Sequence, residues 1–143
     1  MTIVVGYSDT ELGAATLDRA VAEAELRDTS LVLVSQAGLQ HTGEVHREYE
    51  ARREEVATAM SKKAEEIEAR GVRCETRVPR SPSSASEAIL DAANQVDAEL
   101  IVVGLERRSP VGKAFFGSIA QDIILQADAP VLGVKAPAAA QGS

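Results

Sequence analysis

The chain has 143 residues and a formal net charge of −7 at pH 7, with 45% hydrophobic and only 3% aromatic residues. This length suits one domain with a single core, and an acidic chain poor in aromatic residues lacks the basic, base-stacking surface of nucleic-acid binders. Nucleic acid and membrane are therefore not expected partners, and the single cysteine excludes an intramolecular disulfide and a multi-cysteine metal site.

The first half of the chain predicts two buried strands, each followed by a helix. Apolar, β-branched runs at 2–5 (TIVV) and 31–34 (LVLV) are typical of strands covered on both faces. After Thr10, a predicted N-cap, apolar residues recur every three or four positions and indicate a helix. A longer, strongly charged helix is predicted over 45–67, and Gly71 marks its end.

The second half continues this alternation. The segment 73–78 (RCETRV) mixes apolar and charged residues, as expected of a strand at or near a sheet edge, with Cys74 as a buried strand residue. A helical pattern at 85–96, a strand at 100–103 (LIVV), a helix after Ser118 and a strand at 131–134 (VLGV) follow. Because parallel crossovers are right-handed, this order predicts a doubly wound, Rossmann-like α/β domain: one parallel sheet of five strands with helices on both faces.

The ends of the chain give two further predictions. The sequence begins without a basic leader and contains no apolar stretch of about 18 residues, so a cytoplasmic protein is expected. A single domain is predicted over 1–135. Residues 136–143 show no periodic apolar face and are predicted to form a disordered tail.

A glycine-containing loop, GLERRSPVGKAFFGS at 104–118, joins the fourth strand to the last helix. Ligands of doubly wound sheets bind beyond the carboxyl ends of the strands, where this loop lies. Gly117 and Ser118, the latter as N-cap, open a helix whose free N–H groups can hold a phosphate. Three basic side chains against Glu106 leave residues 106–118 with a local charge of +2. The alternative is a plain connector with solvated basic side chains.

This loop and its flanking strands resemble the C-terminal signature of the universal stress protein family: an apolar strand, GxxGxxxxxxxxxG[ST], a helix and PVLxV. Gly104, Gly117 and Ser118 match this register, and APVLGV at 129–134 closes it. The likeness extends over nearly the whole chain, including IVVGYSD at 3–9. It implies the family's strand order, 3-2-1-4-5.

The resemblance also implies a non-catalytic stress-response or signalling protein that binds ATP or AMP, with Mg²⁺ accompanying ATP. In this family pattern the adenosine is lined by Tyr7, Ser8, Asp9, Val34 and Val103, and the phosphates face Gly104, Arg107, Gly117, Ser118 and Ile119. Two positions depart from it. Arg107 replaces the second signature glycine, which makes the phosphate loop a variant one, and Ser8 stands where nucleotide-binding members carry aspartate, with Asp9 one residue later.

These departures leave a second function open, a stress protein that binds no nucleotide and acts as a dimeric protein-interaction module. An enzyme such as a slow ATPase is the third alternative, although no general base, catalytic residue or metal site is evident.

The family pairs its last strand across a two-fold axis. This implies a homodimer through Val131, Leu132, Gly133 and Val134, and an apolar edge strand favours such pairing. A further protein partner is expected but not identified.

Overall fold

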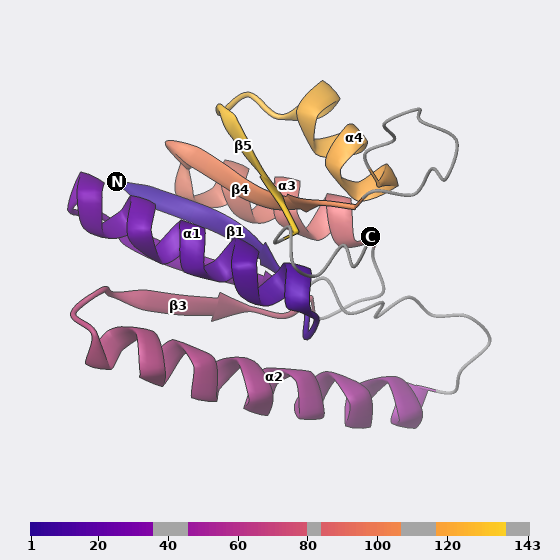
Figure 1. The fold of residues 1–143 in the computed structure, drawn as a ribbon. Helices are drawn as coiled ribbons and strands as arrows, with labels where there is room; N and C mark the ends of the chain where they lie inside the picture. The colour runs from indigo at the N-terminus through magenta and orange to yellow at the C-terminus, as the bar shows by residue number, and fades with distance from the viewer. Residues whose placement is uncertain (36–45, 80–83, 107–116, 137–143) are drawn as a thin grey trace, which may run out of the picture.

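The computed structural model describes residues 1–35, 46–79, 84–106 and 117–136 (Figure 1). Within them strand and helix alternate as β1 (Thr2–Tyr7), α1 (Glu11–Arg27), β2 (Ser30–Ser35), α2 (His46–Ala69), β3 (Cys74–Arg77), α3 (Ala85–Val96), β4 (Leu100–Leu105), α4 (Ser118–Gln126) and β5 (Val131–Lys135). The described strands are all parallel, in the order β3-β2-β1-β4-β5. The predicted doubly wound sheet and its strand order are confirmed.

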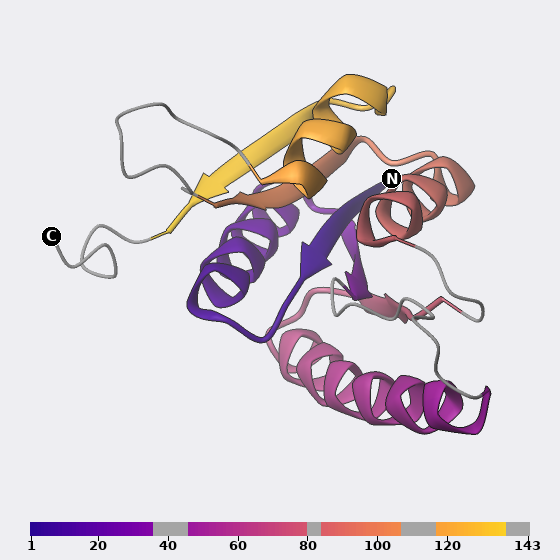
Figure 2. The ribbon, with the colours of Figure 1, turned by 90° about the vertical axis from the view of Figure 1, so that its right-hand side faces the viewer.

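Helices cover both faces of this sheet, and Figure 2 shows α1 and α2 on one side with α3 and α4 on the other. Successive residues of a strand point to opposite faces, so β1 contributes Ile3 and Val5 to one core and Val4 to the other. Each fully buried side chain of this kind contributes roughly 1.5–3 kcal/mol to stability. The core facing α1 and α2 also buries Cys74, which is 7% exposed, as predicted.

The local signals for helix boundaries are mostly confirmed. Thr10 caps α1, since its side chain accepts a hydrogen bond from the backbone N–H of Gly13. α2 ends at Ala69, and Gly71 follows with a φ of 96°, a left-handed conformation that suits glycine.

β3 is shorter than the predicted 73–78, because the backbone beyond Arg77 bonds to a helix rather than to a strand. The carbonyl groups of Val78 and Pro79 accept hydrogen bonds from the guanidinium of Arg53 in α2, at 3.1 and 2.8 Å. As an edge strand, β3 pairs with β2 alone among the described strands. The predicted edge position of this segment is therefore confirmed, with fewer residues in the ladder.

Among the described residues, no helix is both long and apolar enough to cross a bilayer. The prediction of a disordered tail falls on 136–143, of which only Ala136 belongs to the described part of the chain.

Candidate functional site

A cavity of about 300 Å³ lies beyond the carboxyl ends of β1 and β4. Three segments form its walls: the turn from β1 to α1, the end of β4 and the first turn of α4. Its lining residues are Ser8, Thr10, Leu12, Gly104, Glu106, Gly117, Ser118, Ile119 and Ala120. Because β2 and β4 flank β1 on opposite sides, the strand order reverses here, and this is where open α/β sheets hold ligands.

The turn from β1 to α1 is shaped by Gly13. A Cβ atom on this residue would lie only 1.7 Å from the carbonyl oxygen of Ser8, so no larger residue fits without moving the backbone. The close approach brings Thr10 into its capping position, 2.9 Å from the Gly13 N–H, and places the Ser8 hydroxyl 3.0 Å from the Thr10 hydroxyl. Two hydroxyl groups are thereby fixed at the cavity.

Gly104 lets the end of β4 approach α1 closely. A Cβ atom at this position would lie 2.8 Å from both Cγ of Leu12 and Oγ1 of Thr16. Thr16 is itself buried and donates a 2.6 Å hydrogen bond to the carbonyl of Leu12. The glycine is therefore required by helix-to-strand packing, and Gly104 lines the cavity through its backbone.

Gly117 is a glycine of a different kind. Its φ of −60° and ψ of 159° suit any residue, and among the described residues an added Cβ atom would meet nothing nearer than 3.6 Å. It is the N-cap of α4, and Ser118 is the first helical residue rather than the predicted cap, because the extended backbone ends at Gly117. Thr10 and Ser84 accept bonds from the first turns of α1 and α3, whereas Gly117 has no side chain to do so.

The start of α4 is consequently the most anion-receptive part of the cavity. The first N–H groups of a helix have no acceptor within the helix, and the helix dipole adds partial positive charge there. One carboxylate faces the same end: a Cβ atom on Gly117 would lie 3.7 Å from Oε2 of Glu106. The described walls thus combine hydroxyls, backbone amides and a single carboxylate.

The structure brings together five of the residues predicted for the nucleotide, since Ser8, Gly104, Gly117, Ser118 and Ile119 all line the cavity. These residues come from segments that are about 100 positions apart in the sequence. The sheet places them side by side.

The other predicted residues lie elsewhere. Val34 and Val103 are buried, 1% and 0% exposed, in the core facing α3 and α4. Tyr7 is half-buried against the opposite core, and Asp9 is exposed outside the cavity lining. Arg107, predicted to face phosphates, lies outside the described residues.

Sequence reasoning did not assign Thr10, Leu12, Glu106 or Ala120 to the site, although all of them line it. Thr10 was interpreted only as a cap, and Glu106 only as a charge in the loop. The signal for Glu106 was its position two residues after Gly104 inside the signature segment.

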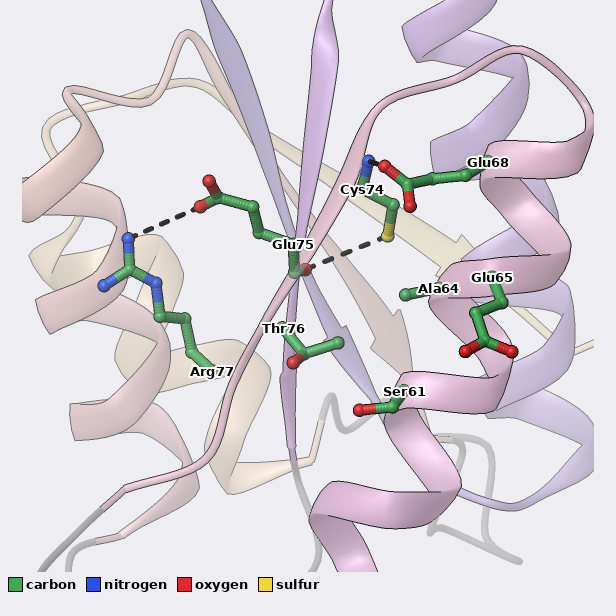
Figure 3. A pocket seen from close by; sticks show the side chains of 8 residues that line it. All are labelled: Ser61, Ala64, Glu65, Glu68, Cys74, Glu75, Thr76 and Arg77. Carbon is green, nitrogen blue, oxygen red and sulfur yellow. Dashed lines mark hydrogen bonds and ion pairs between the residues drawn. The ribbon is translucent and has the colours of Figure 1, made fainter.

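A second hollow, the α2–β3 groove, has a volume of about 590 Å³ (Figure 3). It is lined by Ser61, Ala64, Glu65, Glu68, Cys74, Glu75, Thr76 and Arg77. Arg77 forms a 3.7 Å ion pair with Glu75, and Glu68 accepts a 3.5 Å hydrogen bond from the N–H of Cys74. The carboxylates make this groove a poor place for an anion.

The chemistry of Cys74 follows from the same surroundings. Burial, together with the nearby carboxylates of Glu68 and Glu75, raises the pKa of its thiol from 9.0 to about 12. The thiol therefore stays protonated near neutral pH and is a weak nucleophile. Within the described ranges, no three His, Cys, Asp or Glu side chains gather into a metal-binding group.

The chain matches a known family over most of its length. The model of the universal stress protein family matches residues 1–135. A universal stress protein from Mycolicibacterium smegmatis is 36% identical over 141 residues, which cover 93% of this chain and 96% of the relative.

Solved structures agree. The universal stress protein from Archaeoglobus fulgidus is 32% identical with a TM-score of 0.73, covering 94% of this chain and 98% of its own. A structure of the universal stress protein from Archaeoglobus fulgidus in complex with dAMP is 29% identical with a TM-score of 0.69, over 94% and 98% of the two chains.

Proposed function

The chain belongs to the universal stress protein family, and from this premise we propose that it binds an adenine nucleotide, ATP or AMP, in the cavity between β1 and β4. The relative solved with dAMP supports an adenine nucleotide as ligand, since it shares the fold over 94% of this chain at 29% identity. The position of the cavity at the reversal of strand order supports the same site.

The observation that carries the proposal is the unfilled position at Gly117. Neither the backbone conformation of Gly117 nor its packing against the described residues requires glycine there, unlike at Gly13 and Gly104. The missing side chain leaves room for a ligand directly in front of the first turn of α4. Phosphate is the group that this end of a helix favours, because free N–H groups and the helix dipole both attract negative charge.

In this proposal the phosphates meet Gly117, Ser118 and the N–H of Ile119, and the adenosine extends toward the turn from β1 to α1. The Ser8 and Thr10 hydroxyls there can donate to or accept from ribose oxygens. Of the other predicted contacts, Arg107 would bond a phosphate through its guanidinium. Mg²⁺ would enter with ATP.

The nucleotide acts as a signal in this proposal rather than as a substrate. The one carboxylate among the described residues that line the cavity, Glu106, lies beside the start of α4. Occupancy would change the surface that the protein presents to a protein partner in the cytoplasm. Phosphate release that persists at a steady rate and disappears in Gly117→Val would instead indicate an ATPase.

Isothermal titration of the purified protein with ATP and with AMP tests the function. We expect saturable binding in the wild-type protein and its loss in Gly117→Val, whose branched side chain fills the space before α4. Ser61→Val introduces the same side chain in the α2–β3 groove and should bind as the wild type does. Equal circular dichroism spectra and melting temperatures would show that all three proteins are folded.

Absence of binding in the wild-type protein at millimolar ATP and AMP would overturn the proposal. The function would then be that of a dimeric protein-interaction module. Substitution of Ser8 and Arg107 for the family's aspartate and glycine would be the reason.

We also propose that the protein is a homodimer formed through β5. This strand has β4 on one side and no second neighbour among the described strands, and Val131, Leu132 and Val134 are only partly buried. The adjacent helix α4 exposes Leu125, at 82%, and Ile124, at 46%. Light scattering after size-exclusion chromatography should give twice the 15.1 kDa mass of the chain. A monomer mass at micromolar concentration would contradict this.

A further inference from the structure

A hydrogen bond between side chains joins α3 to α4, the two helices on one face of the sheet (Figure 2). The hydroxyl of Ser86, in the first turn of α3, donates to Oδ2 of Asp122 in α4 at 3.2 Å. Ser86 is only 8% exposed, and a buried hydroxyl needs such a partner. The bond therefore fixes how the beginning of α3 lies against α4.

In the described part of the chain, α4 is otherwise packed mainly through apolar contacts. Ala120 and Ile123 are its buried residues, and burial of apolar surface is a non-directional force. Gly117, its N-cap, has no side chain that could bond the first turn. A hydrogen bond, by contrast, constrains both a distance and an angle. The bond between Ser86 and Asp122 is therefore suited to fix the rotation of α4 about its own axis.

The same helix begins at the cavity between β1 and β4. Residues 117–120 line this cavity, whereas Ser86 and Asp122 are not among its described lining residues. Asp122 follows Ser118 by about one helical turn, so a contact that holds the Asp122 side chain also holds the N–H groups of the first turn. The bond can therefore influence a ligand in the cavity through the position of α4.

We infer that Ser86 and Asp122 are positioning residues for the nucleotide: their hydrogen bond orients the first N–H groups of α4 toward the phosphate. This inference rests on the proposed binding of adenine nucleotide in the cavity. A hydrogen bond weakens steeply when the N–H group turns away from its acceptor, so a small rotation of α4 reduces phosphate binding. Ser86→Ala removes the donor and should bind nucleotide about fivefold more weakly than the wild type, a difference of about 1 kcal/mol.

Titrations with AMP, and with ATP in Mg²⁺, test the inference on four variants. Asp122→Ala removes the acceptor together with a negative charge. Loss of that charge alone would strengthen the binding of an anion, whereas loss of the bond should weaken it about fivefold. The double variant Ser86→Ala with Asp122→Ala should bind no more weakly than either single variant, because both substitutions break the same bond. Asp122→Asn keeps an acceptor oxygen and should bind within about twofold of the wild type.

The matched control is Ser30→Ala, which removes the same hydroxyl from a half-buried serine. Ser30 begins β2 and bonds the Thr2 side chain at 3.3 Å, at the amino ends of the strands and away from the cavity. This variant should bind nucleotide as the wild type does, which separates a general loss of stability from a displaced α4. The amide proton resonance of Ile119 gives a second readout: saturating nucleotide should shift it less in Ser86→Ala than in the wild type.

The inference fails if Ser86→Ala binds as tightly as the wild type, or if its Ile119 resonance shifts equally. It also fails if Asp122→Ala binds more tightly than the wild type, if Asp122→Asn is as weak as Asp122→Ala, or if Ser30→Ala loses as much affinity as Ser86→Ala. Effects that multiply in the double variant would likewise contradict it. In each of these cases the nucleotide-binding function stands. If the wild-type protein binds neither AMP nor ATP in Mg²⁺, the proposed function fails and the inference with it.

Discussion

The cavity between β1 and β4 and the α2–β3 groove differ in chemistry more than in size. The groove is the larger, about 590 Å³ against about 300 Å³, but its walls carry the carboxylates of Glu65, Glu68 and Glu75 (Figure 3). The cavity has hydroxyls and the first turn of α4. The direction of the strands, rather than the volume of a hollow, therefore decides where an anion can bind. In a parallel sheet the helix that follows each strand begins near the carboxyl end of that strand, so the helix N-termini gather at this edge.

The two regions also differ in what glycine does for them. None of the groove residues is a glycine, whereas the cavity depends on close approaches at Gly13 and Gly104 and on an open position at Gly117. Substitutions in the cavity should therefore have large and unequal effects. Changes in the groove should affect only the chemistry of the groove residues themselves, such as the reactivity of Cys74.

The largest effect is expected from Gly13→Ala. Alanine would gain about 1 kcal/mol of helix propensity, but its Cβ would lie 1.7 Å from the Ser8 carbonyl oxygen, so the backbone must move. We expect a loss of at least about 3 kcal/mol in the free energy of unfolding, measured by urea denaturation.

Gly117→Ala is the control, since its Cβ would meet no atom of the described part of the chain nearer than 3.6 Å, and its cost should be about 1 kcal/mol or less. Equal destabilisation by the two substitutions would show that the two glycines do not differ as described.

Thr10→Ala should have an intermediate effect. It removes the cap of α1 and the partner of the Ser8 hydroxyl, bonds of 2.9 and 3.0 Å, and should lower the free energy of unfolding by about 1 kcal/mol. Thr58→Ala, on the exposed face of α2, removes the same atoms and should change stability by about 0.5 kcal/mol or less. A Thr10→Ala protein as stable as the wild type would mean that this cap contributes nothing.

The smallest effect concerns Cys74 in the groove. With a pKa of about 12, the fraction of thiolate near neutral pH is below about one in ten thousand. A thiol reagent at about pH 8 should therefore not react measurably with the native protein, and should react fully in urea. Fast labelling of the native state would contradict the buried, protonated thiol.

The same pKa shift has a consequence for stability at alkaline pH. The unfolded thiol ionises near its ordinary pKa of 9.0, whereas the folded thiol resists ionisation until about 12. The unfolded state therefore loses its proton first, and the stability that this thiol contributes below pH 9.0 declines as pH rises toward 12. Urea midpoints measured across this range should fall more steeply for the wild type than for Cys74→Ala.

The sequence by itself determined the elements and their order. Apolar runs at 2–5, 31–34 and 100–103 are local patterns, and each became a buried strand. The cap at Thr10 and the helix end near Gly71 are equally local, because the interacting atoms lie within a few residues of one another. The segment 104–118 indicated the region of the site through its likeness to the family signature, which is also a pattern within one stretch of the chain.

Only the tertiary structure decided what individual residues of the site do. Gly104 and Gly117 look alike in the sequence, but the first is required by Leu12 and Thr16, whereas no atom of the described residues requires the second. Glu106 became part of the site when β4 and α4 brought it beside Gly117, and Val34 proved to be buried in the core. Such roles depend on distances between segments that only the pairing of distant strands establishes, and periodicity along the chain carries no information about those distances.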